Sequence, residues 1–400
     1  MLEVRFEQEP SPSAPLLGRV AFIAGGDVWV VDLDADQRTR LTRDGRNSHP
    51  SWSADGRWIA YRKGDQLWVV EVSTGKELSV SETPVSAFAW SPVGNRLAYL
   101  SVAEGLVIWD ANWKNRQTLV ESGTANTLMR FAWDVTGEWI AYEVSGREWA
   151  LRKVSLDGNS LTLYTTTDIT RIPHLADWTP DGLWLLTWVG PASASAEVDG
   201  LPLCLVSAVG GAPRCLEQKM LLYSDWLSWS PRGQLAFIAG AGRETWVNKG
   251  LAVINLASLA VHWMITPADQ APIQPAFSPD GTRIAYSAGP ATPAEAAYAR
   301  RDVAMAQRRI WVIEVPSGQK RRLTHDDRFR DERPLWSSDG DYILFARIGE
   351  EGASLWLMRS DGSNLRQVVS ELTPQPDPTG EYGYVNWRVL WDWWQPREIH

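Results

Sequence analysis

The stretch Pro50-Ser51-Trp52-Ser53-Ala54-Asp55-Gly56-Arg57-Trp58-Ile59-Ala60-Tyr61 decides the fold, because the same phrase returns six more times along the chain. Each copy has an aromatic residue, a short turn that ends in Gly, and an apolar run. The aromatic residues that start the seven copies are Trp52, Trp90, Trp133, Trp178, Trp229, Phe277 and Trp336. Recurrence at intervals of roughly 40 to 60 residues is typical of a repeat architecture.

Each copy predicts two strands joined by a tight turn. The first strand ends at the aromatic residue, and in the turn Pro fixes φ while Gly supplies a positive φ. The Ile-Ala-Tyr run is apolar enough to be a strand buried on both faces. A third strand follows, such as Leu67-Trp68-Val69-Val70, and then a second turn and a more polar fourth strand, such as 319–323. Four antiparallel strands at this spacing predict the blades of a β-propeller.

The two ends of the chain supply one more blade. The ranges 19–24, 27–33 and 38–42 predict the second, third and fourth strands of a blade, and Tyr384-Val385-Asn386-Trp387 predicts its first strand. Pairing the two ends removes the open edge of the sheet. We therefore expect an all-β, eight-bladed β-propeller of four-stranded antiparallel blades, whose ring is closed by the N- and C-terminal strands in one blade.

Seven blades is the alternative, if the unit at Trp178 or Trp229 is a decoration. We expect a single propeller domain over residues 18–394, a Pro-rich tail or linker over 1–17 and a short C-terminal tail over 395–400. The composition fits this architecture, because 24 Trp, 31 Gly and 24 Pro favour many short strands joined by tight turns.

The Trp-Ser-Pro-Asp-Gly…Ile-Ala-Tyr phrase resembles the repeat of TolB-like β-propellers, which also occurs in the propeller halves of prolyl oligopeptidases. The resemblance covers roughly residues 18 to 394. The repeat is WD-like, but the Gly-His…Trp-Asp signature of WD-repeat propellers is missing. The resemblance implies the fold and leaves the function open, because this fold hosts many unrelated activities.

Several functional classes find no support in the sequence. The net charge is −9 with Lys and Arg scattered, which argues against a nucleic-acid partner. No run of about 18 apolar residues occurs, so direct membrane insertion is not expected. There is no Gly-x-Ser-x-Gly elbow, phosphate loop or dinucleotide fingerprint, so no catalytic residue is assigned. The absence of these motifs favours a non-enzyme without deciding the question.

Two cysteines bear on the cellular compartment. If Val209-Gly210 is a two-residue turn, Cys204 faces Cys215 across a hairpin, and either a disulfide or two buried thiols would fit. A disulfide would suit an oxidising compartment. We expect an extracytoplasmic protein, periplasmic or extracellular, if a leader was removed, and a cytoplasmic one if Met1 is the native start.

Insertions predict which face binds. Loops over 188–202, 239–250, 288–309 and 347–354 fall on one face of the ring, and insertions on one face usually mark the binding face. The longest is predicted to be helical, with a capping box at Thr292-Pro293-Ala294-Glu295. Its charge comes from Arg300, Arg301, Arg308 and Arg309. It would either dock on a partner or cap its own blade.

Charged residues also concentrate in the connections between blades. Mixed charge suits recognition of a protein or peptide, although any solvated loop shows it too. The candidate binding residues are Arg46, His49, Asp168, Arg171, His174, Asp269, Gln274, Asp327, Arg328, Arg330 and Arg333. The first functional hypothesis is therefore a non-catalytic scaffold or interaction module that binds a protein or peptide partner.

The alternative is a metal-dependent lyase or hydrolase that acts on a sugar or peptide at the channel mouth. His49, His174 and His325 precede the aromatic residues of three copies, and three imidazoles on one face would suit a divalent metal. The resemblance implies the same possibility, because some TolB-like lyases hold a metal in this way. Spacing alone does not show convergence, so no metal ligand is assigned and no cofactor is the default expectation.

Overall fold

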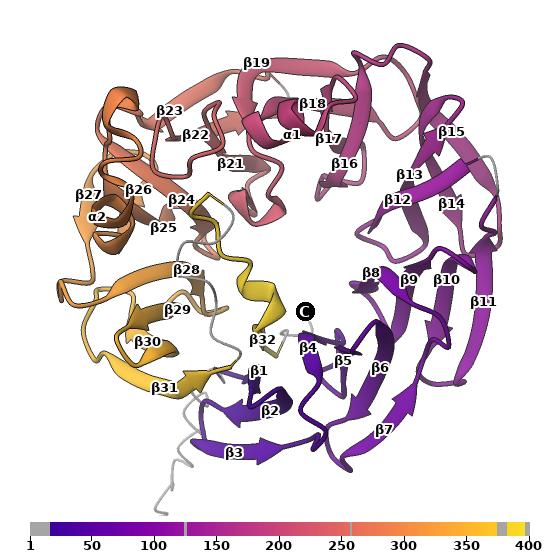
Figure 1. Ribbon diagram of the computed structural model, residues 1–400, viewed down its shortest axis with the longest axis horizontal. Coiled ribbons are helices and arrows are strands. Elements are labelled where there is room, and N and C mark those ends of the chain that lie inside the picture. The colour runs from indigo at the N-terminus through magenta and orange to yellow at the C-terminus, as the bar shows by residue number, and fades with distance from the viewer. Residues whose placement is uncertain (1–16, 124–125, 257, 374–381, 397–400) are drawn as a thin grey trace, which may run out of the picture.

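The computed structural model describes residues 17–123, 126–256, 258–373 and 382–396 and forms a ring of eight sheets around a central channel (Figure 1). Every sheet has four antiparallel strands, and we number the blades 1 to 8 from the sheet that contains β1. The units at Trp178 and Trp229 both belong to complete blades, which confirms eight blades over the alternative of seven.

Blade 1 consists of β32 (Trp391–Trp394), β1 (Arg19–Ala24), β2 (Asp27–Asp32) and β3 (Gln37–Arg40), and blade 2 of β4 (Asn47–Trp52), β5 (Trp58–Lys63), β6 (Gln66–Glu71) and β7 (Lys76–Ser79). Blade 3 consists of β8 (Val85–Trp90), β9 (Arg96–Ser101), β10 (Gly105–Asp110) and β11 (Asn115–Val120). Blade 4 consists of β12 (Asn126–Trp133), β13 (Trp139–Gly146), β14 (Trp149–Ser155) and β15 (Ser160–Thr166). The first strand of each blade lies innermost in the ring (Figure 1).

Blade 5 consists of β16 (Ile172–Trp178), β17 (Trp184–Gly190), β18 (Leu201–Ser207) and β19 (Arg214–Met220), and blade 6 of β20 (Leu227–Trp229), β21 (Gln234–Ala239), β22 (Gly250–Asn255) and β23 (Val261–Ile265). Blade 7 consists of β24 (Gln270–Phe277), β25 (Arg283–Pro290), β26 (Arg309–Glu314) and β27 (Lys320–Arg322). Blade 8 consists of β28 (Arg330–Trp336), β29 (Tyr342–Gly349), β30 (Gly352–Arg359) and β31 (Arg366–Leu372). The helices are α1 (Ala194–Asp199) and α2 (Arg301–Ala306), with 3₁₀ turns at Ser224–Trp226, Ala294–Ala296 and Trp387–Val389.

The repeated phrase works as the sequence predicts. In blade 2 the Ser53 hydroxyl donates to Asp55 over 2.7 Å, and Gly56 adopts a φ of 69° that completes the turn. The Ile59, Ala60 and Tyr61 side chains that follow have no solvent exposure. The turn and the buried second strand are therefore encoded locally and repeat from blade to blade.

The repeated Trp residues join neighbouring blades. The indole Nε1 of Trp90 donates to the Ser51 carbonyl of blade 2 over 3.0 Å, and Trp336 donates to Ala276 over 2.9 Å. Trp52 makes the same bond across the closing joint, to the Asp392 carbonyl, over 3.3 Å. These Trp residues pack and connect blades, so they belong to the scaffold.

The closing strand lies later in the chain than the sequence predicts. β32 pairs with β1, with Val20 opposite Trp393, so the two ends do share one blade. The prediction of a strand at 384–387 is wrong, because Trp387 begins a 3₁₀ turn and its indole donates to the buried Glu332 carboxylate over 3.0 Å. The hydrogen bond between Trp387 and Glu332 holds this segment inside the ring, and the strand begins only at Trp391.

The insertions also depart from the expectation. The predicted capping box is wrong: Pro293 precedes a 3₁₀ turn with no side-chain cap, and only α2 is α-helical. Arg308 and Arg309 are 1% and 2% exposed, so they add no charge to the surface. The expected loop over 347–354 is a tight hairpin in which Gly349 faces Gly352, because β29 and β30 simply extend further.

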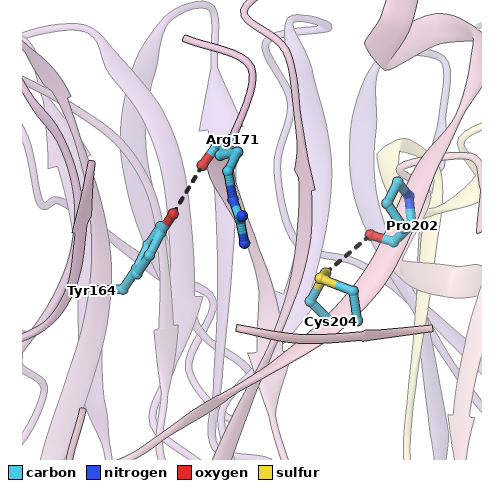
Figure 2. Close-up of a disulfide and its surroundings, with 5 residues drawn as sticks. Tyr164, Arg171, Pro202 and Cys204 are labelled. Carbon is cyan, nitrogen blue, oxygen red and sulfur yellow. Dashed lines mark hydrogen bonds between the residues drawn. A yellow bond between two sulfur atoms is a disulfide. The ribbon is translucent and has the colours of Figure 1, made fainter. Parts of the chain in front are cut away.

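Cys204 on β18 lies directly opposite Cys215 on β19, and a disulfide joins the two residues. In Figure 2 the Cys204 sulfur points toward the Pro202 carbonyl oxygen, and the two atoms are 3.6 Å apart. That approach is a contact only, because a disulfide sulfur has no proton to donate. The bond staples the outer hairpin of blade 5.

Among the described residues no helix is long and apolar enough to cross a membrane. The tail predicted over 1–17 lies outside the described residues except for Leu17, and so does most of the tail predicted over 395–400.

Candidate functional site

Three innermost strands carry the same local distortion. His49, Gln274 and Arg333 each stand three residues before the aromatic residue of their copy, and each has a positive φ, of 54°, 51° and 50°. The strand register shifts at these positions, which marks a β-bulge. Positive φ is uncommon for residues other than Gly, and a bulge re-aims a side chain. Blades 2, 7 and 8 therefore present polar side chains at equivalent places.

The channel contains a cavity of about 750 Å³. One wall runs along β4 from His49 to Trp52 and along β8 from Ser86 to Trp90. The opposite wall comes from residues 222–224, from Arg333 and from the C-terminal segment, which we define as 382–390. In Figure 1 this segment (yellow) runs through the middle of the ring before it reaches β32.

A hydrogen-bond network fixes the C-terminal segment against blades 6 and 7. The Asp225 carboxylate accepts from Gln274 Nε2 and from the Tyr384 hydroxyl, each over 3.0 Å. Gln274 Oε1 in turn accepts from the Arg333 backbone N–H over 3.0 Å. The Tyr384 ring stacks on Tyr223 with centroids 3.7 Å apart. Residues of blades 6, 7 and 8 and the end of the chain are thus tied into one wall.

Arg333 is the cation most enclosed by this wall. Its side chain lies over the Trp391 ring at 4.8 Å, and the residue is only 7% exposed. Its Nε and Nη1 atoms are buried and have no hydrogen-bond partner among the described residues. Burial and then the charge of Arg388 lower the pKa of Arg333 to about 10, so the guanidinium stays protonated at neutral pH.

Further ionisable groups surround the same space. Arg388 donates to the Ser224 hydroxyl over 3.3 Å, and Arg62 donates to the Ser86 carbonyl over 2.7 Å. Burial, helped by the charge of Arg62, lowers the pKa of His49 to about 4, so this imidazole is neutral at pH 7. Asp177 does not line the cavity, but Arg388 lies near enough for its charge to act on this carboxyl, whose pKa is raised by desolvation.

Only part of the predicted binding set reaches the channel. His49 and Arg333 line the cavity, and Gln274 supports it through Asp225. The residues that lie exposed elsewhere on the surface are Arg46, Asp168, Arg171, Asp269, Asp327 and Arg328. Asp327 and Arg328 are engaged there in ion pairs, with Arg309 over 3.0 Å and with Asp326 over 2.7 Å. The two remaining residues of the predicted set, His174 and Arg330, are buried, so the set is divided among the channel, the exposed surface and the interior.

Five of the predicted residues are not in loops. The residues that lie within innermost strands are His49, His174, Gln274, Arg330 and Arg333. The expectation that they occupy blade-to-blade loops is wrong, because the bulge lets each strand begin several residues before its repeated phrase.

The three histidines lie on separate blades. His174 is buried between Glu143 and Glu197, with nitrogen-to-oxygen distances of 3.6 and 3.8 Å, and His325 is exposed between β27 and β28. In the described ranges there is no group of three or more His, Cys, Asp or Glu side chains arranged to hold a metal ion. The histidines therefore offer no common ligand set there.

A second cluster of charges holds the C-terminal segment from behind. The Glu332 carboxylate is fully buried and pairs with Arg308 over 2.5 Å and with Arg330 over 2.6 Å. Arg308 also donates to the Gly383 carbonyl over 2.8 Å. The insertion of blade 7, which contains α2, thus holds the C-terminal segment in place through Arg308.

Several cavity residues escaped the sequence analysis. Tyr223, Tyr384 and Arg388 lie outside the repeated phrase, so periodicity gives no signal for them. A proline follows each of the three bulged positions, in His49-Pro50, Gln274-Pro275 and Arg333-Pro334, so this dipeptide three residues before a repeated aromatic residue is a sequence signal for the bulge.

No known family model matches the chain. An uncharacterized protein of Agrobacterium fabrum (Atu1656) is 30% identical over 138 residues, which is 29% of this chain and 46% of that protein. The Tol-Pal system protein TolB of Desulfosudis oleivorans is 30% identical over 97 residues, 22% of each chain. The matches thus span less than half the length of these curated relatives.

Solved structures share the fold at low sequence identity. Dipeptidyl peptidase 4 of Porphyromonas gingivalis superposes with a TM-score of 0.61 and 11% identity, over 89% of this chain and 60% of that one. An oligogalacturonate lyase of Vibrio parahaemolyticus gives 0.52 and 13%, over 85% and 97%. Proteins of different function thus share the architecture. The chain is an eight-bladed β-propeller, the fold that the resemblance of its repeat to TolB-like propellers implies.

Proposed function

We propose that the protein is a non-catalytic interaction module that takes a peptide, or an extended segment of a partner protein, into its central channel. The observation that supports this most is the cavity of about 750 Å³, which is lined by aromatic, hydroxyl and cationic side chains. Ligand pockets in proteins commonly measure about 300 to 1,000 Å³. The space therefore suits a few residues of a bound chain.

The chemistry of the walls favours a polar peptide. The stacked Tyr223 and Tyr384 rings offer an apolar surface with polar edges, and such side chains are common where proteins bind one another. The walls are innermost strands of rigid blades and a segment fixed by hydrogen bonds. A preformed site loses little entropy on binding. The TolB relative, named as a component of the Tol-Pal system, is consistent with a protein partner.

The test blocks the channel without touching a charge. Ala87 lines the cavity and stands three residues before Trp90, the place that His49 and Arg333 occupy in their blades. Peptides are first captured from a peptide library on the immobilised wild-type protein. We expect Ala87→Trp to fill the space and to reduce the binding of these captured peptides at least tenfold. Val102, which is 79% exposed, gives the control Val102→Trp, which we expect to bind as the wild type does.

Loss of peptide binding in Val102→Trp with normal binding in Ala87→Trp would place the binding site on the outer surface of the ring. If Ala87→Trp bound normally, the channel would not be the binding site. Metal analysis of the purified protein tests the other function: stoichiometric metal that is lost in His49→Gln or His174→Gln would favour the metal-dependent lyase or hydrolase.

We also infer an extracytoplasmic location from the Cys204–Cys215 disulfide, because such bonds persist mainly in oxidising compartments. Thiol labelling under denaturing conditions, on protein taken directly from its native source, tests this inference. We expect no labelled cysteine before reduction and two afterwards; two free thiols at the outset would contradict the location.

A further inference from the structure

The cavity wall contains a buried cation, Arg333, two of whose donors have no hydrogen-bond acceptor among the described residues. Arg333 is 93% buried, since only 7% of it is exposed, and it forms part of the cavity wall. Its Nε and Nη1 donors have no acceptor among the described residues. A buried, charged donor without an acceptor is costly, and native structures rarely keep one that serves no purpose.

The neighbouring carboxylates are already engaged. Asp225 accepts from Gln274 and Tyr384, and Asp392 accepts from the backbone N–H groups of Trp52 and Trp393 over 2.9 and 3.1 Å. Both carboxylates act on Arg333 only through space. Arg333 thus differs from the other buried arginines of blade 8, of which Arg347 pairs with Asp331 over 2.7 Å.

Two further guanidinium groups line the same cavity. Arg388 is near enough to Arg333 for its charge to act on it, and Arg62 has a buried Nε without a partner among the described residues. The nearby His49 is neutral and so does not add to the repulsion. Three arginines and few free acceptors make the space attractive to an anion.

We propose that Arg333, with Arg388 and Arg62, forms a subsite for a carboxylate group of the bound peptide. Trp391 covers one face of the Arg333 guanidinium and leaves its edge for acceptors that lie in the same plane. A planar carboxylate has that geometry. The assignment rests on the proposed function only for the source of the carboxylate; the anion subsite itself rests on the three arginines.

Succinate is the first probe, because it needs no knowledge of the partner. We expect the melting temperature of the wild-type protein to rise and saturate with succinate at constant ionic strength. Arg333→Gln should abolish the saturable rise. Because Arg333 is buried, Arg388→Gln is a second variant that should weaken the succinate response at least threefold. Arg57, 60% exposed and paired with Glu71 at 3.5 Å, supplies the control Arg57→Gln, which should respond as the wild type does.

Inorganic phosphate distinguishes the anion chemistry. Saturation by phosphate without saturation by succinate would overturn the carboxylate assignment, and so would equal succinate responses of the wild type, Arg333→Gln and Arg388→Gln. The outcome does not depend on whether a peptide partner exists.

A peptide from the capture experiment, made with a free acid and with an amide at each carboxyl in turn, links the two proposals. We expect one amide to bind at least tenfold more weakly to the wild type and equally to Arg333→Gln. Peptides that bind in every amide form, but not to Ala87→Trp, would overturn the subsite while the proposed function stood. A succinate response that depends on Arg333, with no captured peptide, would overturn the proposed function while the anion subsite stood.

Discussion

Blades 2 and 8 carry the same repeated phrase but hold their innermost strands in different ways. In both blades the second and third strands join through a tight hairpin, but in blade 2 charged pairs such as Lys63–Glu77 are partly exposed. In blade 8 the acidic residues of the innermost strand are buried, and Glu332 pairs with an arginine from the insertion of blade 7. Both blades contain the repeat, but of the two only blade 8 has its innermost strand held by a buried ion pair with an insertion. We call the cluster of Glu332, Arg308 and Arg330 the buried lock.

The difference shows what the insertions do. Trp246 and Val247 from the blade 6 insertion pack on Ala304 and Met305 of α2, and both insertions contact the C-terminal segment. These loops therefore position one wall of the channel instead of standing free on the surface. Changes in blades 7 and 8 should disturb the channel, whereas similar changes in blade 2 should remain local.

The largest effect is expected at the buried lock. Glu332→Gln removes the buried carboxylate charge that pairs with Arg308 and Arg330 and leaves the buried Arg308 without this ion pair. Breaking a buried ion pair from one side costs about 3 to 5 kcal/mol. Urea unfolding should show a loss of that size in the free energy of unfolding.

Glu77→Gln in blade 2 is the matched control. Glu77 accepts from Tyr61 and pairs with Lys63 over 3.4 Å, and its side chain keeps 28% of its exposure. Exposed pairs contribute about 0 to 1 kcal/mol, so this variant should unfold close to the wild type. Equal losses in the two variants would refute the distinction between the two blades.

A smaller effect is expected at the disulfide, which belongs to a hairpin outside the channel. The double variant Cys204→Ser/Cys215→Ser frees a loop whose ends are 11 residues apart. The chain-entropy model gives a loss of roughly 3 kcal/mol in the free energy of unfolding. Chemical denaturation of the double variant, compared with reduced wild type, should give matching midpoints. Identical midpoints for the oxidised wild type and the double variant would contradict the prediction that the disulfide stabilises the fold.

A still smaller effect is expected at the closing joint. Trp52→Phe keeps an aromatic ring but removes the indole bond to the Asp392 carbonyl, which should cost about 1 kcal/mol. Trp90→Phe removes the equivalent bond to Ser51 inside the ring. Similar losses in thermal unfolding would show that the closing joint equals an internal one. Trp113→Phe, at a residue that is 80% exposed, is the unchanged control.

The fold could be predicted because its signals are local. Turn chemistry such as Ser53-Ala54-Asp55-Gly56 and the buried run after it are written in neighbouring residues and repeated in every copy. The closing strand was misplaced for the opposite reason. Tyr384–Trp387 has a strand-like pattern, but the contact between Trp387 and Glu332 bends it, and that contact joins residues 55 positions apart.

The site could be predicted only where the repeat reaches it. His49 and Arg333 were found because they precede a repeated aromatic residue. Arg388 and Tyr384 were missed because the C-terminal segment has no counterpart in other blades, and only the folded ring brings it against Asp225. A repeat predicts the scaffold, and the departures from the repeat make the cavity.

At His49, on the regular side of the channel, the expected effect is confined to acidic pH. Burial and Arg62 lower its pKa to about 4, below the ordinary value of about 6.5. As the pH falls from 6.5 toward 4, the unfolded chain therefore binds the proton first, and the stability that His49 contributes above pH 6.5 is lost. The difference in unfolding midpoint between the wild type and His49→Gln should shrink over this interval, and the imidazole signal in NMR should titrate near pH 4. Titration near 6.5 would mean that water reaches His49 freely and that the wall of blade 2 is looser than that of blade 8. A carboxylate ligand beside Arg62 and Arg333 would shift the titration upward, because it would offset the positive charge that now opposes protonation.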